Sequence, residues 1–493
     1  MGLRAAGHRA EGRAGPGESR LQTALAYANL HTSDFIEDLK ALLRIPSIST
    51  LPAYREAVWQ AAHCIRDQLA AVGLDRARLI ETTGYPLVAA EWLGAPGKPT
   101  VLFYGHYDVQ PPDGDEPWHQ DDPFTPIVRG DDIYARGASD DKGQLLALLK
   151  ALESLHQVSN DWPVNVRVLI EGEEESGGAG IAAYIRGHTG EIQCDVALIA
   201  DTSMPAPGVP ALVYGLRGIL YTEIRARGAS HDLHSGEFGG IAPNPLHALA
   251  CILAGLKGPD GHISIPGLYE HLTSVSDEEV SLWHNASLNI PGLLQSEMGL
   301  STLPGEQGID PYERVWARPT LEVHGIAGGF TGEGAKTVIP AEATAKVSLR
   351  LPPELQLQPA EVFALLHDRI TQLCPEGISV DVVEIHSGQG VLVPRDNRFM
   401  RVAMRAVEQE WGKPPLLVRT GASIPVGELF QHSLHVPIVF MGTGLPDDNI
   451  HAPNEKYHLP NFMRLVRQTI RFLVYLGDDA HAHGIQEQER GGR

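Results

Sequence analysis

The sequence predicts an α/β protein in which a mostly parallel, helix-covered sheet forms a larger domain, with a ferredoxin-like α+β domain inserted into it. Three observations predict this fold class. The chain has 493 residues, more than one hydrophobic core usually holds. Short apolar runs alternate with helical segments up to about residue 215, as in parallel sheets covered by helices. The order of elements then changes, and the first pattern returns near residue 391.

The larger domain is expected to begin with a helix. Apolar residues recur at helical spacing over residues 21–43, and Pro46 ends the pattern. The elements expected next are a strand over 100–104, a helix over 143–155, and strands over 164–170 and 195–200. A helix over 397–411 and a strand over 436–441 then complete the first sheet.

The inserted domain is predicted from the order of its elements. These are a strand over 219–226, a helix over 245–256, strands over 320–324 and 343–351, a helix over 360–373 and a strand over 379–385. That order is the split βαβ, ferredoxin-like arrangement. Residues 257–318 form an insertion whose place is not predicted.

The predicted organisation therefore has five parts. They are a disordered leader over 1–20, the larger domain over 21–215 and 389–482, the inserted domain over 216–388, and a disordered tail over 483–493. The leader is rich in Arg, Gly and Ala but lacks the apolar region of a secretory signal.

Composition excludes several classes of partner. The formal net charge of −22 argues against nucleic acid and against anionic membranes. The sequence has no run of ~18 apolar residues, so a membrane span is not expected. The four cysteines lie far apart and form no Cys-x-x-Cys pair, which favours a reducing compartment and hence a cytoplasmic location.

Several acidic and histidine residues have ordinary explanations when each is taken alone. His106 and Asp108 follow a predicted strand and point to the same side of an extended chain, but a lone His-x-Asp is a weak signal. Asp140 precedes a helical run, where acidic residues commonly cap the N-terminus. Asp201 and His451 stand where turn residues are common.

The joint pattern is harder to explain in this way. Four glutamates between residues 171 and 175 follow a buried-type strand, which is costly unless a cation compensates them. Ligand sites of open α/β sheets lie at the carboxyl ends of strands. The candidate ligands are two imidazoles and three carboxylates, a set that suits zinc, with manganese or cobalt as substitutes: His106, Asp140, Glu175, Asp201 and His451. With two divalent ions and a bridging hydroxide, the charges of this set balance.

Five motifs, in this order and spacing, resemble those of the carnosinase, cytosolic dipeptidase and aminoacylase family of di-zinc metallopeptidases: GHYDVQP, RGASDDKG, EGEEESGG, LIAD and IHAPNEK. The resemblance covers almost the whole chain after the leader and is closest to the dipeptidase branch. It implies that the larger domain is catalytic. It also implies that the inserted domain is a lid through which two copies form a homodimer.

The resemblance also implies roles for the candidate ligands. Asp140 would bridge two ions, with His106 and Asp201 completing one shell and Glu175 and His451 the other. Asp108 would accept a hydrogen bond from His106 and fix its tautomer without touching metal.

Glu174 matches the family's general base, which takes a proton from the metal-activated water and delivers it to the leaving amine. Glu173 makes the register of this acidic run ambiguous. Glu174 and Glu175 are assigned because they directly precede Ser176 and Gly177.

Four residues of the inserted domain and its surroundings match segments that bind substrate in the family. His234, in SHDLHSG, would reach the partner subunit's active site and stabilise the oxyanion. Arg350, in SLRLP, would pair with the terminal carboxylate of the substrate. Thr337, in GAKT, and Ser423, in GASIP, would add hydrogen bonds.

The sequence therefore predicts a metal-dependent exopeptidase that acts on dipeptides or short peptides. One alternative is an amidohydrolase that removes N-acyl or N-carbamoyl groups from amino acids, because the same ions and base suit those amides. The other is an inactive binding protein on the same fold. A dead site would be expected to lack a ligand or the base, and none of these residues is missing.

Overall fold

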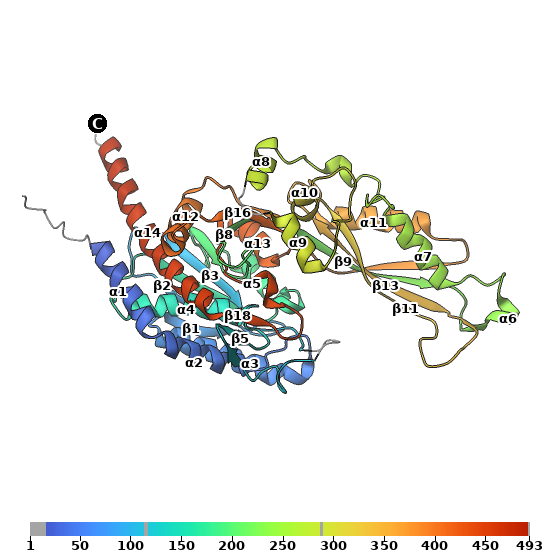
Figure 1. The fold of residues 1–493 in the computed structure, drawn as a ribbon, viewed down its shortest axis with the longest axis horizontal. Coiled ribbons are helices and arrows are strands. Elements are labelled where there is room, and N and C mark those ends of the chain that lie inside the picture. Colours follow the sequence, from blue (N-terminus) through green and yellow to red (C-terminus); the bar gives the residue numbers. More distant parts are fainter. Residues whose placement is uncertain (1–15, 113–116, 286–288, 492–493) are drawn as a thin grey trace, which may run out of the picture. The chain divides into compact units, whose positions relative to one another are not determined.

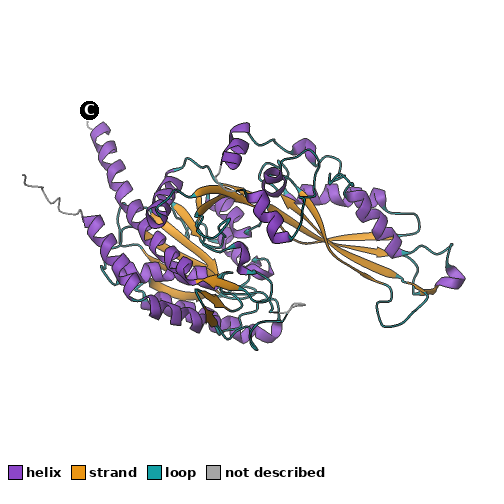
Figure 2. Cartoon of the chain, viewed as in Figure 1, coloured by secondary structure: helices purple, strands orange, loops and turns teal. Residues whose placement is uncertain are grey.

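The computed structural model describes residues 16–112, 117–285 and 289–491, with side chains to residue 479. Most of the predicted leader lies outside the described residues, but residues 16–20 are helical. The chain divides into two compact units. The first unit comprises residues up to 212 with 396–415 and 436–493, and the second comprises 213–395 with 416–435. Figures 1 and 2 show the helices and strands of both units.

The N-terminal helical pattern of the first unit forms two helices instead of the predicted single one. They are α1 (Pro16–Leu30) and α2 (Thr32–Leu43). His31 between them has φ −99° and ψ 18°, outside the helical region, so the chain turns there. A third helix, α3 (Arg55–Ala71), and two strands, β1 (Asp75–Ile80) and β2 (Leu87–Trp92), follow and were not predicted.

The sheet of the first unit has the order β1-β2-β6-β3-β7-β17. Its other strands are β3 (Thr100–His106), β6 (Asn165–Glu171), β7 (Val196–Ile199) and β17 (Ile438–Phe440). These four are parallel, whereas β1 and β2 are antiparallel additions at one edge. The predicted fold class is confirmed, with a mixed sheet whose parallel strands bring their carboxyl ends to one edge.

Helices cover this sheet: α3 packs on β1 and β2, and α4 (Lys142–His156) packs on β3 and on α14 (Leu459–Gly491). Leu145, Leu148 and Leu152 of α4 are almost fully buried. The other helices after the first three are α5 (Ala179–Gly187) and α12 (Arg398–Trp411), and a short helix η2 (Glu174–Ser176) follows β6. The sequence predicts a disordered tail over 483–493, but the helix α14 continues to residue 491. Gln, Glu and Arg in this stretch have a high intrinsic helix propensity, which does not depend on packing.

A small three-stranded sheet ties distant parts of the first unit together. It has the order β18-β5-β4 and is formed by β4 (Ile127–Arg129), β5 (Asp132–Tyr134) and β18 (Lys456–His458). It places the segment after β17 beside the loop that leads to α4. That segment includes a 3-10 turn, η5 (Pro446–Asp448).

The second unit contains a four-stranded antiparallel sheet of order β11-β13-β9-β14. The strands are β9 (Gly218–Arg227), β11 (Thr320–Gly328), β13 (Glu342–Leu351) and β14 (Ser379–Gly388). Two helices, α7 (Pro245–Leu256) and α11 (Pro359–Leu373), pack on one face through a core that includes Leu220, Leu249 and Leu366. This strand order confirms the predicted ferredoxin-like arrangement.

Smaller elements complete the second unit. They are β8 (Ala211–Leu216), β10 (Leu233–His234), α6 (Ser235–Phe238), η3 (Tyr269–His271), α8 (Asp277–Asn285), α9 (Ile290–Met298), α10 (Pro311–Trp316), β12 (Val338–Ile339), β15 (Val391–Leu392), β16 (Leu416–Thr420), α13 (Pro425–Leu429) and η4 (Phe430–Leu434). In the described part of the insertion at 257–318, loops connect three of these helices, α8, α9 and α10, and the short η3.

The unit boundaries differ from the predicted domains at residues 416–435, which the sequence placed in the larger domain and the structure places in the second unit. The reason is local. β16 pairs with β8, and Arg419 at its end forms buried ion pairs of 2.6 Å with Glu279 and 2.5 Å with Glu354.

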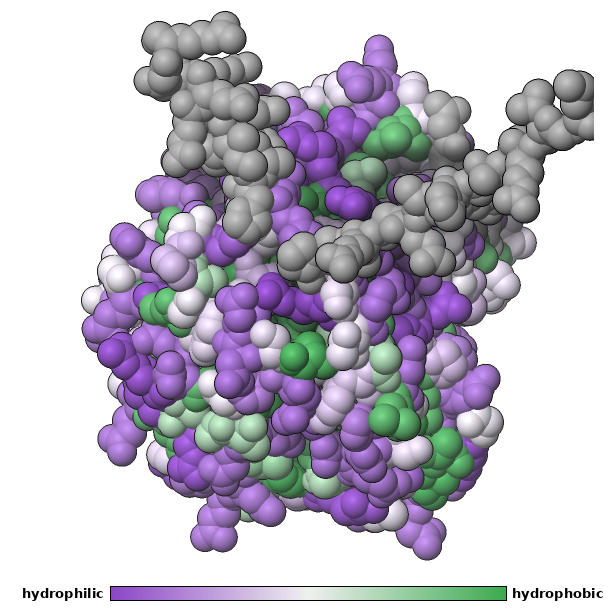
Figure 3. Space-filling model, turned by 90° about the vertical axis from the view of Figure 1, so that its left-hand side faces the viewer, coloured by the Kyte–Doolittle hydropathy of each residue, from purple (hydrophilic) through white to green (hydrophobic). Residues whose placement is uncertain are grey.

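The exposed surface is mainly polar on the side shown in Figure 3, where apolar residues form small separate groups. Within the described part of the chain, no helix combines the length and the apolar character that crossing a bilayer requires.

Candidate metal centre

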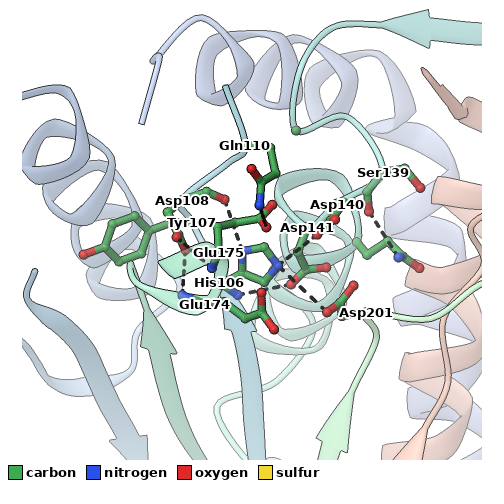
Figure 4. Close-up of polar contacts among 12 residues, drawn as sticks. His106, Tyr107, Asp108, Gln110, Ser139, Asp140, Asp141, Glu174, Glu175 and Asp201 are labelled. Atoms are coloured by element: carbon green, nitrogen blue, oxygen red, sulfur yellow. Dashed lines mark hydrogen bonds and ion pairs between the residues drawn. The ribbon is translucent and has the colours of Figure 1, made fainter. Parts of the chain in front are cut away.

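Five side chains meet at the carboxyl ends of the parallel strands in the first unit. Figure 4 labels the four of them other than His451. His106 ends β3, Asp201 follows β7, Asp140 precedes α4, Glu175 lies in η2, and His451 lies beyond β17. Their ligand atoms form two groups, His106–Asp140–Asp201 and Asp140–Glu175–His451, each within 4.8 Å. These are the two sets that the resemblance implies, and Asp140 belongs to both.

The two oxygens of Asp140 face different histidines. Oδ1 lies 3.0 Å from Nε2 of His106, and Oδ2 lies 2.8 Å from Nε2 of His451. Oδ2 of Asp201 lies 3.9 Å from the first imidazole, and Oε2 of Glu175 lies 3.3 Å from the second. One carboxylate oxygen is thus available to each group, which is the geometry needed to bridge two cations.

The electrostatics of this cluster favour cations. Burial and the charge of Asp140 raise the pKa of Asp201 to about 7, and the same two causes raise the pKa of Glu175. Hydrogen bonds to Asp140 and Glu175 raise the pKa of His451 to about 11. Burial and mutual repulsion therefore make the charged forms of Asp201 and Glu175 costly unless other positive charge is present. Nitrogen and oxygen donors in two groups of three fit divalent cations such as zinc.

Asp108 lies behind the cluster and belongs to neither group. Its carboxylate accepts hydrogen bonds from Ser49 Oγ at 2.6 Å and from the backbone N–H groups of Glu174 and Glu175 at 3.3 and 3.1 Å. Nδ1 of His106 donates to the backbone oxygen of Asp108 at 3.1 Å. Oδ1 of the Asp108 carboxylate lies 3.4 Å from the same nitrogen. Asp108 thus orients two parts of the site. Its backbone oxygen holds the His106 ring, and its carboxylate holds the backbone of η2.

The structure separates the three consecutive glutamates. The side chains of Glu174 and Glu175 point toward His106 in Figure 4. Glu173 instead accepts hydrogen bonds from the backbone of Tyr85 and Gly180. Burial raises the pKa of Glu174 well above its usual value, and neighbouring carboxylates add to this rise. A raised pKa suits a group that must exchange protons near neutral pH.

Three residues of this region were missed by the sequence analysis. Gln110 donates to Glu175 Oε2 at 2.6 Å, and Asp141 accepts from the backbone of His106 at 3.2 Å. Glu455 accepts from Arg136 at 2.8 Å and from three backbone N–H groups of the loop at residues 137–140, at 2.8 to 3.1 Å. All three lie inside the motifs GHYDVQP, RGASDDKG and IHAPNEK. Their position in these motifs is the sequence signal that could have identified them.

The second unit brings two of the four predicted substrate contacts together. Arg350 in β13 donates to Ser423 Oγ at 2.7 Å. Ser423 in turn donates to the backbone oxygen of Arg217 at 2.6 Å. This group lies at one end of β13.

His234 and Thr337 form a separate group. β10 pairs with β12, and the backbone N–H of Ser235 donates to the Thr337 oxygen at 3.1 Å. Both side chains are exposed in the protomer. They adjoin the start of β13. The part of this strand from Glu342 to Arg350, roughly 26 Å at about 3.3 Å per residue, separates them from Arg350.

The fold and this cluster together define a class of protein. A helix-covered sheet whose strand ends carry two donor groups with a shared carboxylate is typical of two-metal hydrolases.

The model of peptidase family M20/M25/M40 matches residues 102–474, and the chain belongs to this family. The chain is 32% identical to the Cys-Gly metallodipeptidase dug1 of Schizosaccharomyces pombe, covering 88% of this chain and 94% of the relative. It is 29% identical to the human Beta-Ala-His dipeptidase, covering 95% and 94%. The solved structure of the di-peptidase Dug1p from Saccharomyces cerevisiae superposes with a TM-score of 0.83 at 28% identity, covering 93% and 98%. These findings confirm the resemblance to metallodipeptidases.

Proposed function

We propose that this protein is a metal-dependent dipeptidase that hydrolyses the amide bond of dipeptides or other short peptides. The observation that carries the proposal is the pair of donor groups sharing Asp140. The relatives named as dipeptidases, which match nearly the whole chain, support the same reaction.

Two divalent cations, zinc in the first place and manganese or cobalt as substitutes, would be held by these groups. When bound, they supply Lewis-acid polarisation of the scissile carbonyl and a lowered pKa for water. Glu174 would accept the proton of the attacking water and return it to the leaving amine. Asp108 keeps Glu174 in place, because its carboxylate binds the backbone of η2.

The second unit would supply the contacts to the rest of the substrate. Arg350 suits the terminal carboxylate, because a guanidinium group can donate two parallel hydrogen bonds to it. Thr337 would add a hydrogen bond. Ser423, which accepts from Arg350 and donates to the backbone oxygen of Arg217, would hold Arg350 in place. His234 would stabilise the oxyanion in the active site of a partner subunit, which agrees with its exposure in the protomer.

We also propose a homodimer formed through the second unit. The edge strand β11 exposes Val323 and Ile326 by 42% and 55%, and the other edge strand, β14, exposes Ile385 by 54%. Exposed apolar edge strands are candidates for pairing with another chain. A cytoplasmic location is proposed from the cysteines, each of which is free.

The test measures metal content per protomer together with hydrolysis of a dipeptide panel that includes Cys-Gly and β-Ala-His. Chelation should abolish activity, and zinc or manganese should restore it with close to two ions bound. N-acyl amino acids serve as the comparison substrates. Exclusive deacylation would replace the dipeptidase assignment with an amidohydrolase, and a metal-free protein without activity after reconstitution would contradict both.

A further inference from the structure

Two arginines of the second unit lack an acidic partner. Arg217 precedes β9, and Arg350 lies in β13. Among the described residues, neither guanidinium forms an ion pair, although the chain has a net charge of −22. Arg217 is 8% exposed, and burial together with the charge of Arg350 lowers the pKa of Arg217 to about 10. Arg350 is partly buried, and Glu322 acts on Arg217 only from beyond ion-pair distance. Two neighbouring cations without an ion-pair partner are costly to maintain.

Neutral protein groups occupy only part of the Arg217 guanidinium. Its Nε donates to the backbone oxygen of Gly421 at 3.3 Å. Its Nη1 donates to the backbone oxygen of Arg318 at 3.3 Å and to Thr320 Oγ1 at 3.4 Å. In the described part of the chain, no acceptor contacts Nη2. A Cβ atom at Gly421 would lie 2.7 Å from Nη2, so the glycine keeps the space beside this donor open.

Ser423 links this donor to Arg350. A serine hydroxyl carries a single proton, and that of Ser423 is donated to the backbone oxygen of Arg217. Its oxygen accepts from Arg350 Nη1. In this arrangement Ser423 has no proton left for a carboxylate. It positions Arg350 instead.

The two arginines share one side of the sheet. Arg350 is paired with Ile219 across the ladder, and Arg217 lies two residues before Ile219. Side chains two residues apart in extended chain point to the same side. The free N–H groups of Arg350 and Nη2 of Arg217 therefore belong to one surface, with Ser423 between them.

We propose that Arg217 is a second arginine of the carboxylate-binding site, so that the terminal carboxylate of the substrate is held by two guanidinium groups. The inference rests on the proposed dipeptidase function and adds a specificity-determining residue to it. It assigns a role to Gly421 as well, because any side chain at that position would displace Nη2.

The experiment compares alanylglycine with alanylglycinamide, which lacks the negative charge. Arg217→Met should lower kcat/KM for the free acid on the order of 10²-fold, because a hydrogen bond to a charged group is lost, and should leave the amide within about threefold. Gly421→Ala should reproduce this selective loss, and Arg217→Lys should recover part of it. Arg314→Met is the matched control, because the Arg314 guanidinium also donates to backbone oxygens, those of Ile309 and Leu303.

Metal content and thermal unfolding are measured for every variant. Equal losses for the acid and the amide, or no loss for either, would overturn the role of Arg217. If Arg217→Met does not fold, the outcomes for Arg217→Lys and Gly421→Ala decide. A wild-type enzyme that hydrolyses neither probe counts against the dipeptidase function itself. Calorimetric binding of the two probes to wild type and Arg217→Lys then tests the carboxylate site separately, and equal affinities would reject it.

Discussion

The donor cluster of the first unit and the predicted substrate-contact residues of the second unit differ in how the protein holds them. All five candidate ligands lie within one unit, at the ends of neighbouring parallel strands, where hydrogen bonds interlock them. The four residues of the second unit form two groups at opposite ends of β13, and one group is exposed.

The five candidate ligands and Glu174, the proposed base, all lie in the first unit, so this unit holds the complete donor set by itself. The second unit presents donors that are only partly used: Nη2 of Arg217 contacts no acceptor in the described part of the chain. We therefore expect a substrate or a second chain to provide the missing hydrogen-bond acceptors.

The largest effect is expected from Asp140→Ala, because this residue serves both donor groups. Its loss should remove both cations and lower activity on the order of 10³-fold or more, since polarisation and water activation are lost together. Elemental analysis and dipeptide turnover measure the two effects. Asp67→Ala is the control, because Asp67 is exposed and, in the described part of the chain, forms side-chain hydrogen bonds only with its neighbour Arg66. A variant that kept two tightly bound ions would show that Asp140 is not the shared ligand.

Glu174→Gln should separate proton transfer from cation binding. The amide has nearly the same shape but cannot act as a base, so kcat should fall by about 10²- to 10⁴-fold with metal content unchanged. Glu173→Gln is the matched control, because that side chain binds the backbone of Tyr85 and Gly180. A larger loss in the control than in Glu174→Gln would reverse the assignment of the base.

His234→Ala tests whether the second unit works across a dimer. Loss of one oxyanion donor should lower kcat on the order of 10²-fold. Mixing this variant with Glu174→Gln should restore part of the activity, since a heterodimer would combine one intact cluster with one intact histidine. His231→Ala, a change at an exposed neighbour, should have little effect. Absence of complementation, with subunit exchange verified, would argue that His234 acts only within its own chain.

The smallest effect is expected from Glu455→Gln. Glu455 acts on the donor cluster indirectly, through its hydrogen bonds to the backbone of the loop at residues 137–140. The amide would accept fewer backbone hydrogen bonds from the loop that carries Asp140, and cation affinity should fall by about 10- to 100-fold. Chelator competition measures this change. Glu410→Gln is the control, because Glu410 is also buried and accepts from Arg467 and Arg471 elsewhere in the first unit. Equal affinities in both variants would reduce Glu455 to a role in folding.

The sequence predicts those features that depend on local pattern. Strand ends carrying His106 and Asp201 could be located because apolar runs stop there. The division of the first helix at His31 could not, because both halves keep the same apolar spacing. β1 and β2 were not predicted, because they add to the sheet as antiparallel strands and do not belong to the βαβ pattern.

Contacts between distant segments explain the remaining differences. Glu455 stands in a recognisable motif, but its four hydrogen bonds depend on how the chain closes. The place of residues 416–435 depends on the buried pairing of Arg419 with Glu279 and Glu354, which no periodicity reveals. The proton of Ser423 is likewise committed by a backbone oxygen that is distant in sequence.

The hydrogen bond between Asp140 and Glu455 also sets an order of events during synthesis. It joins positions 315 residues apart, with the second unit encoded between them. At about 5–20 residues per second, a ribosome would need roughly 15 to 60 s to make that stretch. During this time the nascent chain carries an acidic loop without its anchor. The candidate ligand His451 is also made only then, so the complete donor set cannot assemble until late in synthesis.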